Sequence, residues 1–374
     1  MKNCDEMNEV GLLTIHQSVN CGASLQAAAL YNAIRNLGHR PRVIDYRPRQ
    51  FMSFMDESNK AQRRTPRGML KTALLGRRIE RTRRSFEEYG LRWYPSWTER
   101  FNTFEELVDA SFRFDRYICG SDQIWNPPHV RYDNSWMFGF VEKKPGVRIA
   151  SYAASIGSDS LADRDIEWLK AGLPKFDFIG VREDTAVSLL SQMGYTSVQC
   201  VDPVFLADPV DWIDQQKAPD IELPDRYIFY YPVDPNCIEE SLLLELKRRH
   251  GMKCVAISDK LIKPKHADIT VSGYSPEIFL YLLYNAEIVF TNSFHGLAFS
   301  IIFGKPLVSF RNPTKNSRLE SLLRLAQLEG FQIDSCDALR ANDPYEGGER
   351  LRSAYSEMGD HVEQSRRYLA DVLG

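Results

Sequence analysis

The stretch Glu287-Ile-Val-Phe-Thr-Asn-Ser-Phe-His-Gly-Leu-Ala-Phe-Ser-Ile-Ile-Phe303 decides the fold. An apolar run of strand length ends at Thr291 and passes through a short polar turn into a second apolar run of helical length. Asn292 or Ser293 is a natural N-cap for that helix. The stretch therefore predicts a buried strand that leads directly into a helix, which is the repeating unit of parallel sheets covered by helices.

The same alternation extends in both directions and predicts an α/β protein without internal repeats. The expected strands are 11–15, 42–45, 116–119, 149–153, 176–181, 198–201, 227–231, 253–257, 269–271, 287–291 and 307–310. The expected helices between them include 24–37, 163–171, 183–193, 239–250, 276–285, 294–303 and 318–326.

The length of 374 residues predicts two domains, each able to bury its own core. The Pro-rich passage 207–224 is the best candidate for the linker, which gives domains at 1–207 and 208–345. The periodic, charged tail 346–374 predicts one terminal helix that packs back on the first domain. Residues 51–100 interrupt the alternation and are interpreted as an inserted helical hairpin or a flap.

Composition limits the classes of function. A net charge of -3 argues against a general nucleic-acid binder, and 43 % hydrophobic with 26 % charged residues is ordinary for a soluble globular protein. The longest apolar runs are far shorter than a membrane span, and the start of the chain does not resemble a secretory signal, so the cytoplasm is the expected compartment.

The seven cysteines are scattered and never form a Cys-x-x-Cys pair, which disfavours a disulfide framework and a zinc site. P-loop, zinc-protease and serine-hydrolase motifs are absent from the sequence as well. We therefore expect no metal.

Within Lys60 to Arg84 the sequence holds ten Lys or Arg and one Glu, with apolar residues between them. A basic amphipathic helix of this kind suits an anionic membrane surface or a diphosphate-bearing lipid. It is equally consistent with a helix face that is simply solvated.

Polar groups follow several strands, and in open α/β sheets ligands bind at the carboxyl ends of strands. His295 would lie in the first turn of its helix, beside an anion held by the helix N-terminus, where it could exchange a proton near neutral pH. A capping or packing histidine fits the same spacing. Arg182, at another strand end, could grip a carboxylate or phosphate, or form a salt bridge to Glu183 or Asp184.

Two further turns lie in the first half. Asp122 could accept a proton from a sugar hydroxyl and Trp125 could stack on a sugar ring, although as a bare pattern Gly120 to Asn126 is only a turn. In the turn from Asn20 to Gln26, Gly22 would let a ligand approach the backbone, and this turn lacks the glycine pattern of dinucleotide folds.

Taken in order, six segments resemble the polysaccharide pyruvyl transferase family, and the resemblance covers most of residues 10 to 330. The segments are Asn20-Cys-Gly-Ala-Ser-Leu-Gln26, Gly120-Ser-Asp-Gln-Ile-Trp-Asn126, Ser151-Tyr-Ala-Ala-Ser-Ile-Gly157, Val181-Arg-Glu183, Asp202-Pro-Val-Phe-Leu206 and Ser293-Phe-His-Gly296 through Phe303-Gly-Lys-Pro306. Each is weak alone, but the ordered set is specific.

The resemblance implies two Rossmann-like domains arranged as in GT-B glycosyltransferases. It also implies phosphoenolpyruvate as donor, without a cofactor, and a saccharide acceptor, expected to be linked to a polyprenyl diphosphate. The product would be a pyruvate ketal on a surface polysaccharide precursor, such as that of a capsule or exopolysaccharide, plus phosphate. The enzyme would act in the cytoplasm, with peripheral membrane contact through residues 60–84.

On this resemblance His295 would protonate the methylene carbon of the donor or relay a hydroxyl proton. Arg182 would hold the donor anion, together with the helix N-terminus at Asn292 and Ser293 and, as an additional cation, Lys305. Some branches of the family carry an arginine where this chain has Ser293. Arg318 or Arg311 is expected to supply that charge.

The acceptor side is implied to lie in the first domain, at Asp122, Trp125, Asn20, Gly22 and Gln26. Two other functions stay open at this point. One is a GT-B glycosyltransferase with a sugar-nucleotide donor, and the other is a non-catalytic member that binds glycans.

Overall fold

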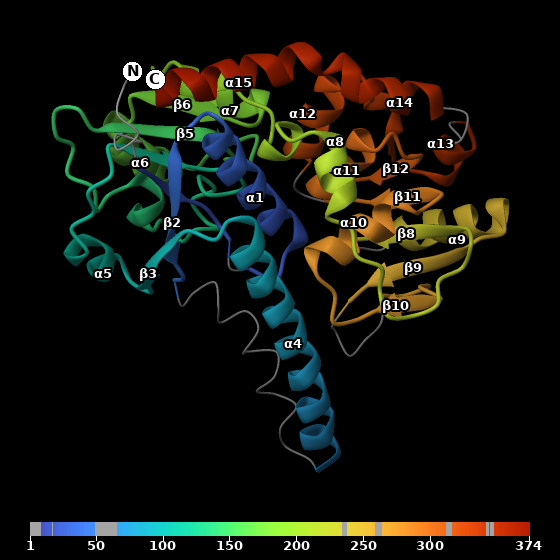
Figure 1. Ribbon diagram of the computed structural model, residues 1–374. Helices are drawn as coiled ribbons and strands as arrows, with labels where there is room; N and C mark the ends of the chain where they lie inside the picture. Colours follow the sequence, from blue (N-terminus) through green and yellow to red (C-terminus); the bar gives the residue numbers. More distant parts are fainter. Residues whose placement is uncertain are drawn as a thin grey trace.

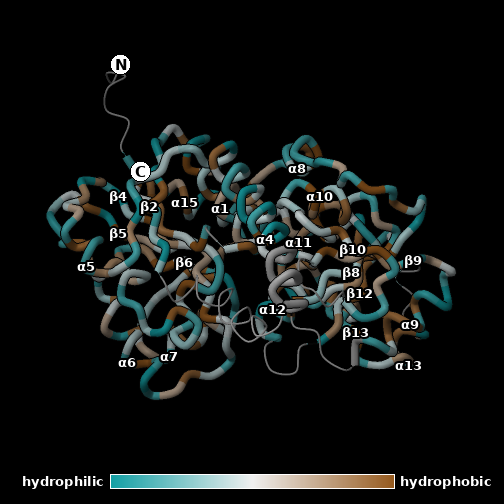
Figure 2. The backbone as a smooth tube through the Cα atoms, turned by 90° about the horizontal axis from the view of Figure 1, so that it is seen from below, coloured by the Kyte–Doolittle hydropathy of each residue, from teal (hydrophilic) through white to brown (hydrophobic). Residues whose placement is uncertain are grey.

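A computed structural model describes residues 9–16, 18–48, 66–233, 238–258, 264–311, 316–341, 344 and 348–374, with only the backbone described at 66–75 and 238–239. Two parallel α/β domains lie side by side, and α4 and α11 lie between them (Figures 1 and 2). The predicted α/β class with two Rossmann-like domains is confirmed. Within the described part of the chain, none of the helices has the length and apolar character that a membrane span requires.

The first domain is a seven-stranded sheet in the order β3-β2-β1-β4-β5-β6-β7, with every neighbouring pair parallel. Its strands are β1 (Glu9–Leu13), β2 (Arg40–Tyr46), β3 (Trp97–Phe101), β4 (Arg116–Cys119), β5 (Arg148–Ala154), β6 (Phe178–Val181) and β7 (Val198–Gln199). Its helices include α1 (Cys21–Asn36), α4 (Pro66–Trp93), α5 (Phe104–Asp109), α6 (Asp163–Gly172) and α7 (Asp184–Gln192). The strand order reverses between β1 and β4, where ligand crevices form in such sheets.

The second domain is a six-stranded parallel sheet in the order β10-β9-β8-β11-β12-β13. Its strands are β8 (Tyr227–Tyr231), β9 (Lys253–Ile257), β10 (Ile269–Val271), β11 (Ile288–Thr291), β12 (Leu307–Phe310) and β13 (Gln332–Ile333). Its helices are α9 (Ile238–His250), α10 (Pro276–Tyr284), α11 (Phe294–Ile302), α12 (Ser317–Leu325) and α13 (Cys336–Ala341). Every residue of β11 is buried, as expected for a central strand covered on both faces.

The chain passes from the first sheet to the second between Gln199 and Tyr227, a span that contains the predicted linker and the short helix α8 (Pro209–Asp214). Two strands, β3 and β13, were not predicted. The strand expected at 11–15 lies at Glu9–Leu13, so Thr14 and Ile15 already belong to the turn that leads to α1.

The insertion differs from its prediction. Residues 51–65 lie outside the described part, but 66–93 form the single 28-residue helix α4 instead of a hairpin, followed by the edge strand β3. Figure 1 shows α4 running along the boundary between the domains, with its first turns extending beyond both. Its last turns are fixed by Tyr89, whose hydroxyl donates to Gln215 Oε1 at 2.9 Å, and by the edge contact of Phe86 with Tyr274.

The tail forms two helices where one was predicted, α14 (Gly348–Glu357) and α15 (Gly359–Leu373). Helix α14 packs on α11, and α15 crosses to the first domain (Figure 1). There the Tyr368 hydroxyl donates to the Ser151 carbonyl at 2.8 Å, and Ser365 Oγ accepts from the Val201 N–H at 2.9 Å. The predicted return to the first domain is therefore confirmed for the second of these helices.

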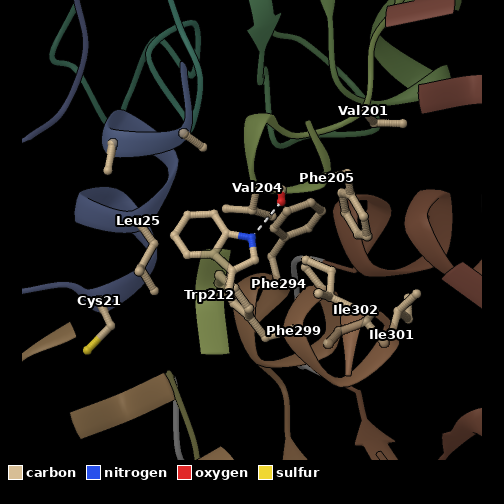
Figure 3. Packing of buried hydrophobic residues seen from close by; sticks show 14 of the residues in the cluster. Cys21, Leu25, Val201, Val204, Phe205, Trp212, Phe294, Phe299, Ile301 and Ile302 are labelled. Carbon is tan, nitrogen blue, oxygen red and sulfur yellow. Dashed lines mark hydrogen bonds between the residues drawn. The ribbon is translucent and has the colours of Figure 1, made fainter. Parts of the chain in front are cut away.

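A shared apolar core joins the domains. Trp212 of α8 lies at its centre, with its indole edge on Phe299 of α11 and its Nε1 donating to the Val204 carbonyl at 3.1 Å (Figure 3). Leu25 and Cys21 of α1 close the cluster from the first domain. Removing a buried indole typically costs about 3–5 kcal/mol, so this cluster is a main determinant of how the domains sit on each other.

Candidate active site

The site is centred on the start of α11, where His295 is the second helical residue and only 6 % exposed. Ser293 is the N-cap, because its Oγ accepts from the Gly296 N–H at 3.3 Å. Asn292 has another role: its Oδ1 accepts from the Val233 N–H at 2.8 Å and so ties the end of β11 to the turn after β8. The turn therefore holds the imidazole in one place.

His295 also contacts the first domain. A Cβ atom added at Gly22 would lie 2.0 Å from His295 Nδ1, so only glycine leaves room for the ring. Gly22 is itself the second residue of α1, whose N-cap Asn20 accepts from the N–H groups of Gly22 and Ala23. Two helix N-termini, one from each domain, therefore meet at one imidazole.

The other ring nitrogen faces a carboxylate. His295 Nε2 lies 3.7 Å from Asp202 Oδ2 and, among the described residues, has no hydrogen-bond partner. Asp202 is fixed by Arg182 Nη1 at 2.7 Å, by the Ser121 hydroxyl at 3.2 Å and by the Val204 N–H at 3.2 Å. Burial raises the pKa of Asp202, but the His295 ring and the Arg182 guanidinium outweigh it and hold the pKa well below its usual range.

Asp202 was not singled out from the sequence as a site residue, although it opens one of the family-like segments. Its carboxylate lies 3.7 Å from His295 Nε2 and so faces the ring from the first domain. The only signal was the short segment Asp202-Pro-Val-Phe-Leu206, which does not indicate that a residue of the first domain will contact a helix of the second.

Arg182 follows β6 and lies inside the same cluster. Besides Asp202, its guanidinium lies 3.8 Å from Asp122 Oδ1 and 3.7 Å from Glu183 Oε1, and its Cζ stands 4.1 Å from the Phe294 ring centroid. Its Nε and Nη2 are buried and have no hydrogen-bond partner among the described residues. Pairing with Asp184, one of the readings left open by the sequence, is wrong, because Asp184 binds Arg324 at 2.8 Å.

Arg318 of α12 lies with Arg182, Asp202 and Phe294 around one small cavity. With the Gln123 amide turned so that its hydrogen bonds are satisfied, its oxygen accepts from both terminal nitrogens of Arg318, at 3.2 and 3.3 Å. Burial, followed by repulsion from Arg182, lowers the pKa of Arg318. An anion bound between two such guanidinium groups would relieve this repulsion.

The structure distinguishes the two candidate replacement arginines. Arg311 is exposed and binds Glu320 at 3.3 Å and Gln332 at 3.3 Å, whereas Arg318 lies at the cavity. Arg318 is therefore the cation placed beside Arg182.

Asp122 also belongs to the cluster. It is 8 % exposed and adopts a left-handed conformation, with φ of 64°, in the turn after β4. Burial raises its pKa, but Arg182, His295 and Arg318 together lower it below the usual value. The carboxylate is thus ionised and lies on the first-domain side of the site.

Two predicted acceptor contacts need correction. Trp125 is completely buried, with its ring edge on Phe176 and its Nε1 directed at the Trp136 carbonyl, so neither ring face is open to a sugar. Gln26 is also fully buried: its Nε2 donates to Thr14 Oγ1 at 2.7 Å, and its Oε1 accepts from the Ser121 N–H at 2.9 Å. It is a structural link between the turns after β1 and β4.

Lys305 needs correction as well. It lies after the C-terminal end of α11, at the entry to β12, whereas His295 lies at the other end of this helix. Its Nζ stands 5.8 Å from the Tyr284 ring centroid. A nine-residue helix is about 13 Å long, so Lys305 is separated from the anion site by the length of α11.

Comparisons with solved structures show the fold. The UDP-GlcNAc 2-epimerase of Neisseria meningitidis bound to UDP-GlcNAc aligns with a TM-score of 0.52 at 10 % identity, over 98 % of this chain and 100 % of that one. Anabaena HepE in complex with UDP-glucose aligns with a TM-score of 0.55 at 10 % identity, over 98 % and 99 %. These neighbours support the GT-B arrangement.

The sequence comparisons are of two kinds. No curated protein matches the chain. A family model described as polysaccharide pyruvyl transferase matches residues 20–313, which include Gly22, Asp122, Arg182, Asp202 and His295. With this match and the two-domain arrangement around His295, the chain belongs to the polysaccharide pyruvyl transferase family and is a transferase.

Proposed function

We propose that the chain transfers the pyruvyl unit of phosphoenolpyruvate to a saccharide, forming a ketal and releasing phosphate. The observation that carries the proposal is the set of buried, unsatisfied groups in one cluster, namely Nε and Nη2 of Arg182 and Nε2 of His295, with Arg318 at the same cavity. A small ligand with two anionic groups and a carbon that accepts a proton would complement this set. The cavity measures about 10 Å³, so the surrounding side chains must move apart to admit such a ligand.

In the proposed reaction His295 Nε2 gives its proton to the methylene carbon, which becomes a methyl group, and positive charge develops on the adjacent carbon. One sugar hydroxyl adds to that carbon, and a second displaces phosphate. Of the two hydroxyl protons, one restores His295, and the other leaves with phosphate. Asp122 would accept a hydroxyl proton in transit, and the Asp202 carboxylate would lie beside the ring throughout.

The charged groups of the site indicate how the donor would be bound. Arg182 and Arg318 would hold one anionic group, and the N-terminus of α11 would favour the other. The N–H groups of Ser293 and Gly296 already donate to Thr291 Oγ1 and Ser293 Oγ, so those of Phe294 and His295 would face the anion. Glu183 and Asp202 offset the positive charge of the buried Arg182 guanidinium.

The test is phosphate release from phosphoenolpyruvate with a panel of lipid-linked saccharides that includes the native precursor. Release that depends on both substrates supports the proposal. His295→Ala should lower turnover by about 10²–10⁴, the usual contribution of a general acid, with an unchanged melting temperature. Absence of release across the panel would refute it.

A sugar-nucleotide donor is the competing function, since Anabaena HepE was solved with UDP-glucose in a similar fold. The two are separated by thermal shift: stabilisation by a uridine or guanosine sugar and none by phosphoenolpyruvate would favour the glycosyltransferase. A chain that binds saccharides and shows no turnover, whether or not His295 is changed, would be the glycan-binding member.

We further propose that the acceptor is carried by a membrane and that the basic segment 60–84 makes peripheral contact with it on the cytoplasmic face. In its described part, Arg78 and Arg84 are exposed on α4. Each basic residue near an anionic bilayer contributes about 1 kcal/mol. Flotation with phosphatidylglycerol vesicles should recover the protein at low salt and lose it at high salt, and equal recovery with neutral vesicles would contradict the contact.

A further inference from the structure

A polar groove of about 920 Å³ separates α4 from the second domain, and none of its lining residues belongs to the His295 cluster. One wall is α4, with Arg77, Arg81 and Glu88. The opposite wall is formed by Lys217 and Asp220 after α8, and by residues between β10 and α10. The volume suits a ligand of the size of a small saccharide with phosphate groups.

Some of the cations in the groove have no ion-pair partner among the residues that the structure describes. Arg84 is paired with Glu80 at 3.1 Å, and Arg92 lies 3.8 Å from Glu277. Arg77, Arg81 and Lys217, by contrast, make no ion pair within the described parts of the chain. Arg77 and Arg81 are one helical turn apart, so their side chains emerge from the same face of α4.

The side chain of Arg81 packs against the backbone of the second domain at Gly273. Gly273, between β10 and α10, has φ of +66°, and a Cβ there would lie 3.1 Å from Arg81 Cδ. The glycine therefore allows the stem of Arg81 to lie against the chain of the second domain. The guanidinium is presented to the groove by a specific contact.

The opposite charges in the groove are two carboxylates, Glu88 and Asp220, that likewise make no ion pair within the described residues. Carboxylates accept hydrogen bonds from sugar hydroxyls, while a pair of arginines with a lysine suits adjacent phosphates. The groove thus combines the recognition chemistry of a phosphate pair with that of a sugar.

We propose that this groove binds a glycosyl diphosphate, with the phosphates against Arg77, Arg81 and Lys217 and sugar hydroxyls against Glu88 and Asp220. That the ligand is the carrier end of the acceptor rests on the proposed function. Helix α1 connects the two places, because it packs against α4 and α10 along its length and touches His295 through Gly22.

The experiment measures binding by calorimetry in the absence of phosphoenolpyruvate, with farnesyl-diphospho-N-acetylglucosamine and inorganic pyrophosphate as probes. The double variant Arg77→Gln/Arg81→Gln should weaken both probes about tenfold or more, as loss of charge-assisted contacts does. Asp220→Asn should weaken the sugar-bearing probe and leave pyrophosphate unchanged. The matched control is Arg78→Gln, an exposed neighbour on α4 that does not line the groove.

Three results would overturn the proposal. They are equal binding by the double variant and the wild type, equal loss with Arg78→Gln, and an effect confined to phosphatidylglycerol vesicles, which would make the two arginines part of a membrane face. The binding measurement contains no donor, so it is independent of the transfer reaction. Binding in the expected pattern would support the groove proposal even if the separate assay showed no phosphate release and the proposed function failed.

Discussion

The N-termini of α1 and α11 have the same local structure but contribute differently to the site. Each follows a central strand of its sheet, each has a side-chain N-cap, Asn20 or Ser293, and each places a distinctive second residue at the domain boundary. In α1 that residue is Gly22, which supplies space, and in α11 it is His295, which fills it. Equivalent positions in two similar domains thus form one site because one of them lacks a side chain.

The largest effect is expected from removing the Arg182 guanidinium, which pairs with the carboxylates of the first domain beside His295. Arg182→Met leaves Asp202, Asp122 and Glu183 close together in a buried cluster without their main cation. Breaking a buried ion pair costs about 3–5 kcal/mol, so the free energy of unfolding in urea should fall by that amount. Arg324→Met, which removes a partly exposed pair with Asp184, is the control, and an equal loss there would refute the assignment.

Filling the space at α1 should have the next largest effect. In Gly22→Ala the new methyl group would overlap the His295 ring, so the ring or α1 must move. Overpacking of this kind costs about 1–3 kcal/mol. Turnover should fall far more than stability, whereas Gly330→Ala, an exposed position where an added Cβ meets no atom within 4 Å, should leave turnover unchanged. Full activity of Gly22→Ala would show that the contact is not required.

The two caps can be compared directly. Ser293→Ala and Asn20→Ala each remove a side-chain acceptor from a helix N-terminus, and each should cost about 1 kcal/mol in thermal or urea unfolding. Only Ser293→Ala should also raise KM for phosphoenolpyruvate, since only α11 faces the proposed donor anion. Equal effects on KM would place the anion between the two helices.

The smallest effect expected concerns pH. Asp202 and Asp122 have folded pKa values below their unfolded value of about 3.9, so their contribution to stability is complete above that value and is lost as the pH falls through the folded pKa. Urea midpoints should therefore decline as the pH is lowered below about 4. Asp202→Asn should flatten this decline, and an unchanged slope would exclude Asp202 as a contributor.

Local signals in the sequence were sufficient for the strand-to-helix units and limited the cap of α11 to Asn292 or Ser293, of which the structure shows Ser293. They failed where a role depends on distant segments. Trp125 follows a strand just as a sugar-stacking residue would, and only the packing of Phe176 and Trp136 shows that it is buried. Asp202 gains its importance from contacts with Arg182 and with α11, which no local pattern encodes.

The helices α4, α11 and α12 show the same limit of prediction from local sequence. The 28 residues of α4 contain the expected basic, amphipathic pattern. No sharp signature in the sequence shows that the chain does not reverse near their middle, so a hairpin or a flap was predicted for this region. Lys305 is near His295 in sequence, yet the rise of α11 separates them. Arg311 and Arg318 were equivalent candidates in the sequence until the fold placed one on the surface and one at the cavity.

The hydrogen bond from the Val201 N–H to Ser365 Oγ connects the last helix to the backbone beside the candidate site. Val201 immediately precedes Asp202, so α15 fixes the backbone from which the partner carboxylate of His295 projects. A fusion or truncation at the C-terminus would therefore act on the position of the Asp202 carboxylate, and through it on the surroundings of His295. Expression tags for this enzyme are better placed elsewhere than on α15.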